Sequence, residues 1–398
     1  MEIIRQEYID KLLRYSKIKD IKIITGLRRS GKTTVLKQFI SFIKTNNIAT
    51  EENILTYDFN NRLLLDKLTW QNFTIGVIQK AKNKNTKIFL IIDEIQELKD
   101  WQKSIKTLFE NDQINFDIYL TGSNSQTLST DISTWFSGRH ININLLPITF
   151  NDLVKYKILN FDKNDFKKYL EFGGLGKIIP FYDDITEMKL LLRNIINDAI
   201  FKDVYKRYKI KDKDSFEKTF KYIFDTIGNE ISLNNISKLL KVNYRTTKQQ
   251  IKWMCNANVI NEINYYDVKG KRLLKTNSKY YSLDLGIIGS VNGFNKNFGW
   301  KLENLVYLDL LKKYEYVYTY KNKNGKQIDF ICINDSIITY IQVTKYLVPK
   351  NEENSNWDRE IGVLASIRDS NRKICICFEN ETERLDNGIE IINILDWL

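Results

Sequence analysis

The chain has 398 residues, of which 43% are hydrophobic and 13% aromatic, so it is long enough for more than one domain and too apolar to be disordered as a whole. Its formal net charge of +12 favours an anionic partner such as a nucleic acid, although its many Lys, Asn and Ile residues are also typical of AT-rich genomes. Four scattered cysteines, one histidine and no apolar run of about 18 residues argue against a zinc site, a histidine-based triad and a membrane span, and favour a cytoplasmic protein.

The first pattern with a chemical meaning lies near the amino terminus. Residues 1–20 indicate an amphipathic helix, and residues 21–25 indicate a short buried strand. Residues 26–33 then fit GxxxxGK(S/T), and apolar residues at helical spacing follow over 34–43. Strand, glycine loop and helix are the context in which this pattern binds phosphate, because loop N–H groups and the helix N-terminus attract anions. The stretch predicts a site for a nucleoside triphosphate.

A second acidic pattern follows about sixty residues later. Residues 53–58 indicate a strand, 70–81 a helix and 87–92 a continuous apolar strand that ends in Asp93 and Glu94. This is the Walker B arrangement, in which Asp93 would hold the Mg²⁺ shell and Glu94 would polarise the attacking water. We therefore expect ATP and Mg²⁺ as cofactors, with Lys32 on the β- and γ-phosphates and the Thr33 hydroxyl on the metal.

Two further loops follow predicted strands. Residues 116–120 indicate a strand, after which Ser123 or Asn124 would sense the γ-phosphate, or would only cap a helix. Arg139 precedes a strand over 141–145 and would complete a phosphate site from the same or a neighbouring subunit, or would lie on the surface at a helix end. The predicted catalytic residues are Lys32, Glu94 and Arg139, and the predicted metal ligands are Thr33 and Asp93. The predicted nucleotide-binding residues are Gly26, Arg28, Arg29, Ser30, Gly31, Lys32, Thr33, Thr34, Asp93, Ser123 and Asn124.

Strands that alternate with helices predict an α/β domain over residues 1–150, with a parallel sheet covered on both faces. Several segments of the chain resemble the bacterial and archaeal family of AAA-type P-loop ATPases that carry a C-terminal domain of unknown function. The resemblance implies ATP hydrolysis, but no uniform biological role. The matching segments are residues 23–34, 92–96, 120–124, 137–139, 146–150, 172–174 and 202–204, so it extends over most of the chain.

The middle of the chain predicts two further segments, a helical lid or linker and a winged helix-turn-helix. Residues 151–215 indicate a helical lid or linker that packs on the ATPase sheet. Residues 216–292 indicate a winged helix-turn-helix, with helices over 233–240 and 244–257 and a hairpin behind them. Alternatively, the winged helix only packs between domains. The predicted DNA contacts are Arg245, Lys248 and Lys252 on the second helix, and Lys271 and Arg272 in the wing.

Residues 293–398 resemble the restriction-endonuclease-like, PD-(D/E)xK fold. Glu303 on a helix, Asp329 on a strand and Gln342 on the next strand match the order of its first three site residues. Lys345 does not match the fourth, because side chains alternate along a strand and Thr344 shares the face of Gln342. Glutamine also replaces a carboxylate at the metal site. We therefore predict a catalytically degenerate domain.

Together these features predict an ATPase that uses nucleotide-driven conformational change and acts with nucleic acid. One alternative is a signalling or defence switch that binds a protein partner, and another is an ATP-gated DNA nuclease. A homo-oligomer is compatible with a role of Arg139 in a neighbouring subunit.

Overall fold

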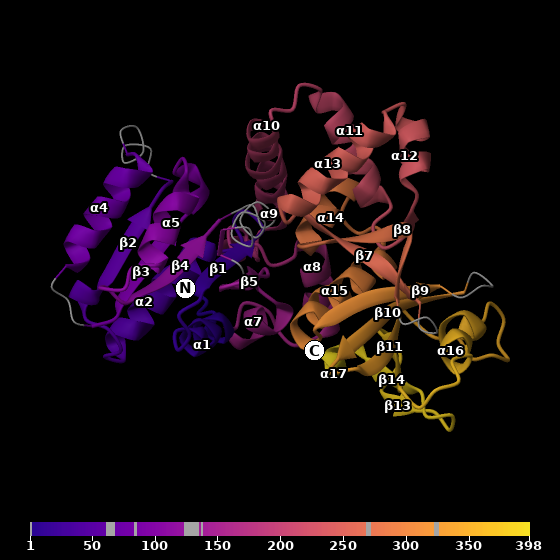
Figure 1. Cartoon of the computed structure of the whole chain (residues 1–398). Coiled ribbons are helices and arrows are strands. Elements are labelled where there is room, and N and C mark those ends of the chain that lie inside the picture. The colour runs from indigo at the N-terminus through magenta and orange to yellow at the C-terminus, as the bar shows by residue number, and fades with distance from the viewer. Residues whose placement is uncertain are drawn as a thin grey trace. The chain divides into compact units, whose positions relative to one another are not determined.

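The computed structural model describes residues 2–60, 68–82, 86–122, 135–136, 138–267, 272–321 and 326–398, with only the backbone of 198, 199, 267 and 272–276. The chain forms two compact units, which Figure 1 shows in sequence colours. The first unit comprises Met1–Pro147 with Asn256–Asn258, and the second comprises Ile148–Cys255 with Val259–Leu398. Among the described residues, no helix is both long and apolar enough to span a membrane.

The first unit is built on a five-stranded sheet in the order β2-β3-β4-β1-β5. Every neighbouring pair is parallel, so the carboxyl ends of all five strands lie at one edge. The predicted α/β fold with a parallel sheet is therefore confirmed. The strands are β1 (Ile21–Gly26), β2 (Ile54–Asp58), β3 (Ile88–Asp93), β4 (Phe116–Thr121) and β5 (His140–Leu145).

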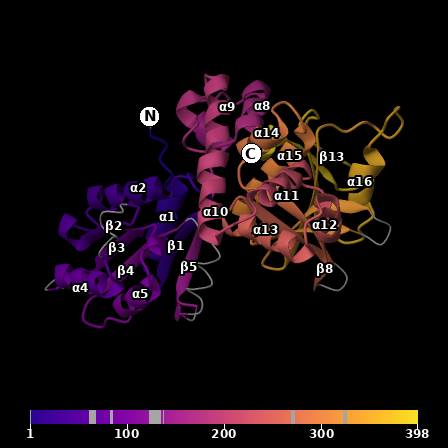
Figure 2. The same cartoon turned by 90° about the horizontal axis from the view of Figure 1, so that it is seen from above.

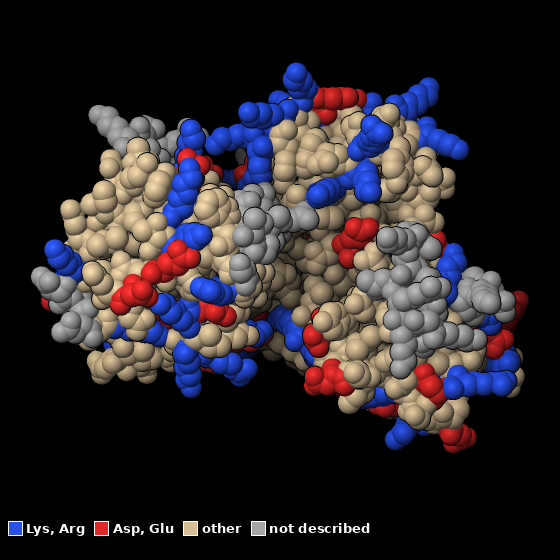
Figure 3. Space-filling view, viewed as in Figure 1, with Lys and Arg blue, Asp and Glu red and all other residues tan. Residues whose placement is uncertain are grey.

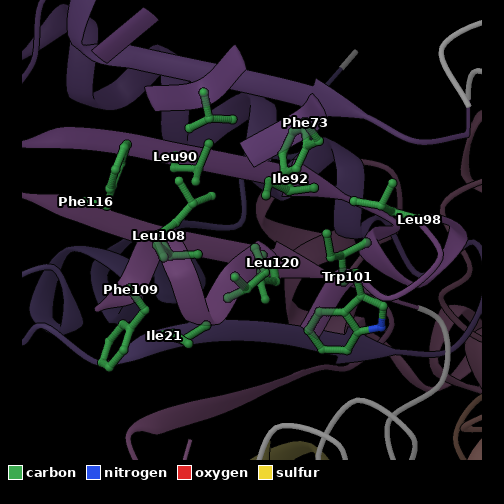
Figure 4. Close-up of a cluster of buried hydrophobic side chains, with 14 of the residues drawn as sticks. Ile21, Phe73, Leu90, Ile92, Leu98, Trp101, Leu108, Phe109, Phe116 and Leu120 are labelled. Atoms are coloured by element: carbon green, nitrogen blue, oxygen red, sulfur yellow. The ribbon is translucent and has the colours of Figure 1, made fainter. Parts of the chain in front are cut away.

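Helices cover both faces of this sheet, because its strands are apolar on both sides. Helices α1 (Gln6–Tyr15) and α2 (Lys32–Thr45) pack on one face, and α4 (Trp70–Ala81) and α5 (Trp101–Phe109) pack on the other (Figure 2). A hydrophobic core lies between the sheet and the helices on each face. Figure 4 shows the core on the face of α4 and α5, where Trp101 of α5 lies with residues of α4 and the sheet. Short 3-10 turns, η1 (Glu51–Asn53) and η2 (Ile95–Glu97), adjoin β2 and β3.

A buried ion pair lies within the other core of the first unit. The Lys22 ammonium of β1 lies 2.5 Å from the Asp117 carboxylate of β4, and the two side chains are 0% and 1% exposed. Lys22 also donates to the Ile18 carbonyl at 2.6 Å, and the Tyr119 hydroxyl donates to Asp117 at 3.0 Å. Lys87, which precedes β3, adds a second ammonium 3.0 Å from Asp117. These contacts fix the amino-terminal ends of β1, β3 and β4 to one another and to the end of α1.

The second unit begins with helices that include the segment predicted as a lid. Helix α8 contacts α14 (Leu285–Asn292) and α15 (Phe298–Lys313) of its own unit, and the role of residues 151–215 as a lid stays a prediction. The helices of this segment are α7 (Phe150–Lys155), α8 (Lys163–Phe172), η3 (Ile179–Phe181), α9 (Ile185–Asn194), the π-helix η4 (Ile195–Phe201) and α10 (Lys202–Tyr208).

The two residues after α8 are glycines because a side chain on either one would collide with a neighbouring group. Asp284 caps α14 by accepting from the Gly286 N–H, and it also accepts from the Gly174 N–H, each at 2.9 Å. A Cβ on Gly173 would lie 2.5 Å from the Asp284 carboxylate, and one on Gly174 would lie 1.7 Å from the Ile148 carbonyl. Burial raises the pKa of Asp284 to about 7. The two glycines therefore allow the α8 end to approach α14 closely.

The following elements have the order expected of a winged helix. Strand β6 pairs antiparallel with β8, and β8 pairs antiparallel with β7, so the two helices are bracketed by a small sheet. The assignment as a winged helix nevertheless stays a prediction, and Lys271 in its predicted wing lies outside the described residues. The elements are α11 (Lys213–Asp225), β6 (Glu230–Ile231), α12 (Leu233–Leu240), α13 (Tyr244–Asn256), β7 (Ile260–Asp267) and β8 (Arg272–Ser282).

The small sheet is continuous with the carboxyl-terminal sheet. The nine strands have the order β13-β14-β12-β11-β10-β9-β7-β8-β6, and β7 joins β9 in parallel through Tyr265 and Thr319. The segments predicted as two domains, 216–292 and 293–398, thus share one sheet. The remaining elements are β9 (Tyr316–Lys321), β10 (Gln327–Asn334), β11 (Ile337–Thr344), α16 (Trp357–Ala365), β12 (Arg372–Cys377), β13 (Glu383–Arg384), β14 (Glu390–Asn393) and α17 (Ile394–Trp397).

The buried ion pair of the first unit gives a stability prediction. Lys22→Met should lower the free energy of unfolding by about 3–5 kcal/mol, because it leaves the Asp117 carboxylate buried without its closest ammonium. Urea-dependent hydrogen exchange of peptides that cover β1 and β4 measures this loss separately from the second unit. Lys11→Ala is the control, since Lys11 forms an exposed pair with Glu7 and should change stability by less than about 1 kcal/mol. Equal effects of the two substitutions would contradict the prediction.

Candidate functional site

The loop between β1 and α2 is shaped by two glycines. Gly26 has φ 151°, and a Cβ there would lie 2.5 Å from the Leu145 carbonyl of the adjacent strand β5. Gly31 has φ 99° and precedes the first residue of α2, with open space around its Cα. Arg29 also has a positive φ of 68°. Alternation of right- and left-handed residues turns backbone N–H groups toward one point, which makes a concavity suited to an anion.

Two buried polar side chains lie inside this loop. The Lys32 ammonium donates to the carbonyls of Gly26 and Leu27, each at 3.2 Å, and its residue is 5% exposed. The Ser30 hydroxyl is buried and has no hydrogen-bond partner among the described residues. A buried hydroxyl that lacks a partner costs free energy, so a ligand oxygen in the loop would satisfy it.

Asp93 connects the loop to the sheet. At the carboxyl end of β3, its carboxylate accepts from the Thr33 hydroxyl at the start of α2, at 2.6 Å, and from the Thr121 hydroxyl at the end of β4. Burial raises the pKa of Asp93, and the charges of Glu94 and Asp58 raise it further, while the two hydroxyls lower it. Carboxylate and hydroxyl oxygens are hard ligands of the kind that Mg²⁺ prefers, so Thr33 and Asp93 fit a magnesium site.

Glu94 is held by its neighbours next to Asp93. It has a left-handed backbone with φ 52°, and its N–H donates to the Thr121 hydroxyl at 2.9 Å. The Gln96 amide donates to the Glu94 carboxylate, while the Gln96 carbonyl oxygen is buried without a partner among the described residues. A strained backbone and an unsatisfied amide are features of functional sites, where the surrounding structure offsets their cost.

The other predicted nucleotide-site residues divide into three groups. Arg28, Arg29 and Thr34 are exposed on or beside the loop. Ser123 and Asn124, the predicted sensors, lie outside the described residues. Arg139 is exposed, but its backbone precedes β5 and its carbonyl accepts from the Ile21 N–H, at the amino-terminal end of β1.

The position of Arg139 excludes one of the alternatives that the sequence left open for it. Strand β1 runs from Ile21 to Gly26, so Arg139 and the phosphate loop lie at opposite edges of a parallel sheet, roughly 16 Å apart along the strand. An arginine side chain is too short to cover that separation. Arg139 therefore does not contact a phosphate in the loop of its own chain, and a role in a neighbouring subunit stays a prediction.

The predicted DNA contacts on α13 lie together. Arg245, Lys248 and Lys252 are exposed, and their spacing places them on one face of the helix. Figure 3 shows Lys and Arg side chains over the region that Figure 1 labels α11, α12 and α13. Lys271 and the side chain of Arg272 lie outside the described part of the structure. This helix face is suited to a polyanion.

Three of the four predicted nuclease-like residues converge in the second unit. Glu303 of α15 and Asp329 of β10 share a contact with the Lys279 ammonium of β8, at 3.2 and 3.6 Å. Gln342 of β11 accepts from the Asp329 backbone N–H at 3.2 Å. Lys345 is exposed, and its ammonium lies 5.6 Å from the centre of the Phe298 ring. That Lys345 does not complete the site stays a prediction.

Sequence reasoning missed three residues that contact the predicted ones: Thr121, Gln96 and Lys279. Thr121 ends the strand next to that of Asp93, and Gln96 follows Glu94 by two residues. Their positions in the sequence could therefore have indicated that they lie near the acidic pair. Lys279 gave no such signal, since its contacts with Glu303 and Asp329 join residues 24 and 50 positions away.

Two parts of the chain match known domain profiles. Residues 19–154 match the AAA domain, and residues 163–297 match a domain of unknown function, DUF8612. An uncharacterized protein of Haemophilus influenzae is 29% identical over 408 aligned positions, which cover 100% of this chain and 98% of that protein. The uncharacterized protein MJ1544 of Methanocaldococcus jannaschii is 30% identical over 354 positions, which cover 84% of this chain and 76% of MJ1544.

Solved structures give weaker similarities. AMPPCP-bound DnaA from Aquifex aeolicus has a TM-score of 0.32 and 14% identity, over 62% of this chain and 86% of that chain. The Hsp104–ADP complex of S. cerevisiae has a TM-score of 0.35 and 17% identity, over 65% of this chain and 40% of that chain. Family membership is shown instead by the sequence match to MJ1544, which covers most of both chains. The chain belongs to the same protein family as MJ1544 and carries an AAA domain over residues 19–154.

Proposed function

We propose that the first unit binds and hydrolyses ATP with Mg²⁺. The observation that carries the proposal is the link between Thr33, Asp93 and Thr121, which joins the glycine loop to the carboxyl ends of β3 and β4. The match of residues 19–154 to the AAA domain supports it. Loop N–H groups and Lys32 would bind the β- and γ-phosphates, and Ser30 would donate its hydroxyl to a phosphate oxygen.

Thr33 and Asp93 would hold Mg²⁺ in this proposal. When bound, Mg²⁺ neutralises phosphate charge and thereby eases attack on the γ-phosphorus. Glu94, beside Asp93, would accept a hydrogen bond from the attacking water and orient it. In the structure the Glu94 carboxylate accepts a hydrogen bond from the Gln96 amide. Gln96 therefore acts as a positioning residue, because its amide fixes the position of the Glu94 carboxylate that would orient the water.

Two substitutions separate hydrolysis from binding. Glu94→Gln should lower kcat for ATP hydrolysis by roughly 100-fold or more while leaving ATP affinity within about threefold, because it removes the base and keeps the side-chain shape. Lys32→Ala should weaken ATP binding by at least about tenfold, because it removes the charge on the phosphates. Phosphate release and fluorescent-ATP titration measure the two effects. Turnover by Glu94→Gln at the wild-type rate would contradict the assignment of the base.

The proposed role of Gln96 has its own test. Gln96→Ala should lower kcat by about tenfold with little change in KM, because Glu94 loses the amide that fixes its carboxylate. Steady-state hydrolysis over a range of ATP concentrations measures kcat and KM. Gln71→Ala is the matched control, since Gln71 is exposed on α4, and it should hydrolyse ATP like the wild type. A rise in KM without a fall in kcat would assign Gln96 to nucleotide binding instead.

We further propose that α13 of the second unit contacts nucleic acid. The support is the line of exposed cations formed by Arg245, Lys248 and Lys252, together with the net charge of +12. Each cation that neutralises a phosphate releases bound counterions, so binding through this face depends steeply on salt. ATP-driven conformational change would then act on a nucleic acid. The alternative partner is a protein, for which the exposed Leu239 and Tyr244 beside the same helices offer apolar contacts.

A charge-matched pair of variants tests this contact. Replacing Arg245, Lys248 and Lys252 by alanine should reduce the slope of log Kd against log salt for double-stranded DNA by about 2–3 units. Fluorescence anisotropy across a salt series measures the slope. Replacing the exposed Lys163, Lys350 and Arg372 by alanine removes the same charge elsewhere in the second unit and should leave the slope nearly unchanged. Equal slopes for both variants, or no DNA binding at low salt, would favour a protein partner.

A further inference from the structure

A buried lysine lies where the nuclease-like resemblance requires a metal ion. The side chain of Lys279 is 3% exposed, and its ammonium contacts Glu303 at 3.2 Å and Asp329 at 3.6 Å. The two carboxylates, on α15 and β10, are themselves 14% and 12% exposed. Burial disfavours the charged form of Lys279, but the two neighbouring carboxylates outweigh that effect and raise its pKa. The Lys279 ammonium therefore lies within ion-pair distance of both carboxylates.

The carboxylate oxygens beside this lysine also accept hydrogen bonds from other groups of the protein. The Tyr281 hydroxyl donates to the same Glu303 oxygen that Lys279 contacts. The Val343 N–H donates to the second oxygen of Asp329 at 2.9 Å. A divalent ion in a phosphodiesterase site needs several oxygens at about 2.0–2.6 Å, together with bound water, and an adjacent ammonium repels it.

The glutamine that replaces a carboxylate is engaged as well. The Gln342 oxygen accepts from the Asp329 N–H at 3.2 Å, and its amide donates to Glu360 at 2.7 Å. Among the described residues, no group of three or more His, Cys, Asp or Glu side chains could hold a metal ion. The residues at this position therefore do not fit the metal of the nuclease-like fold.

We infer that the Lys279 ammonium replaces a divalent cation between Glu303 and Asp329, and that this cluster holds the second unit together instead of cleaving phosphodiesters. Lys279 lies on β8, a strand of the predicted wing, while its partners lie on α15 and β10. A charge pair at this point fixes the wing strand to the carboxyl-terminal sheet. A latent cation site remains between the two carboxylates, and it becomes available only when the ammonium is removed.

The test compares Mn²⁺ binding by the full chain without nucleotide. Lys279→Met should lower the melting temperature by roughly 5–10 °C, because two buried carboxylates lose their counterion. It should also bind one Mn²⁺ ion more than the wild type, as counted by electron paramagnetic resonance, and this ion should restore part of the lost melting temperature. The double variant Lys279→Met, Glu303→Gln should not bind the additional ion, because one of its two carboxylates is gone.

Lys345→Met is the matched control, since it removes the exposed lysine of the same predicted site. It should leave both the melting temperature and the Mn²⁺ count at wild-type values. A folded Lys279→Met variant that binds no additional ion would overturn the inference. If Lys279→Met does not fold, a cleavage assay that compares the wild type with Asp329→Asn tests the inference instead. Mg²⁺- or Mn²⁺-dependent cleavage of supercoiled DNA by the wild type, lost in Asp329→Asn, would overturn the inference, and no cleavage by either protein would support it.

Discussion

The hydrogen bonds to Asp93 are the interaction on which the geometry of the first unit depends. Its carboxylate joins α2, through Thr33, to β4, through Thr121, and Thr121 in turn fixes the backbone of Glu94. These contacts are possible only because the sheet is parallel, which brings the ends of β1, β3 and β4 to one edge. A buried carboxylate needs compensating partners, so the sheet order, the loop and the acidic pair constrain one another. The parallel direction of β1 and β5 also explains why Arg139 does not reach the phosphate loop of its own chain, since the loop before β5 lies at the other edge of the sheet.

Local patterns in the sequence predicted most helices and strands of the first unit to within a few residues. Continuous apolar runs identified β1 and β3 as buried strands, because burial on both faces leaves a strong trace in composition. Apolar residues at helical spacing identified α2. Sequence alone could not give the order of the strands, which depends on packing between segments far apart in the chain. For that reason the sequence left open whether Arg139 completes a phosphate site in its own chain, and Thr121 was passed over in favour of the residues that follow it.

The second unit was harder to predict because its main connections are not local. The helices around residues 233–256 and the hairpin behind them agree with the predicted order, but the continuation of that hairpin into the carboxyl-terminal sheet depends on one pairing between Tyr265 and Thr319. The bulge between Ile263 and Tyr265 has no pattern in the sequence that would reveal it. Lys279 likewise lies in an ordinary alternating strand, and nothing in its neighbourhood predicts that it reaches two carboxylates on other elements. A buried charge can be identified only when the fold supplies its partners.

Two buried aspartates, Asp93 in the first unit and Asp329 in the second, are bonded in opposite ways, and this difference separates the chemistry of their two sites. Asp93 is bonded by neutral hydroxyls among the described residues, so in our proposal its charge remains for the Mg²⁺ ion that binds with the nucleotide. Asp329 is bonded by an ammonium and a backbone N–H, so a cation of the chain itself already lies beside it, although burial and the charge of Glu303 raise its pKa. A site that must accept and release a metal with each turnover cannot keep a fixed cation of its own, whereas a site that must hold three elements together benefits from one. Metal-dependent chemistry therefore belongs to the first unit in our proposal, and the second unit contributes a stable frame and the exposed cations of α13.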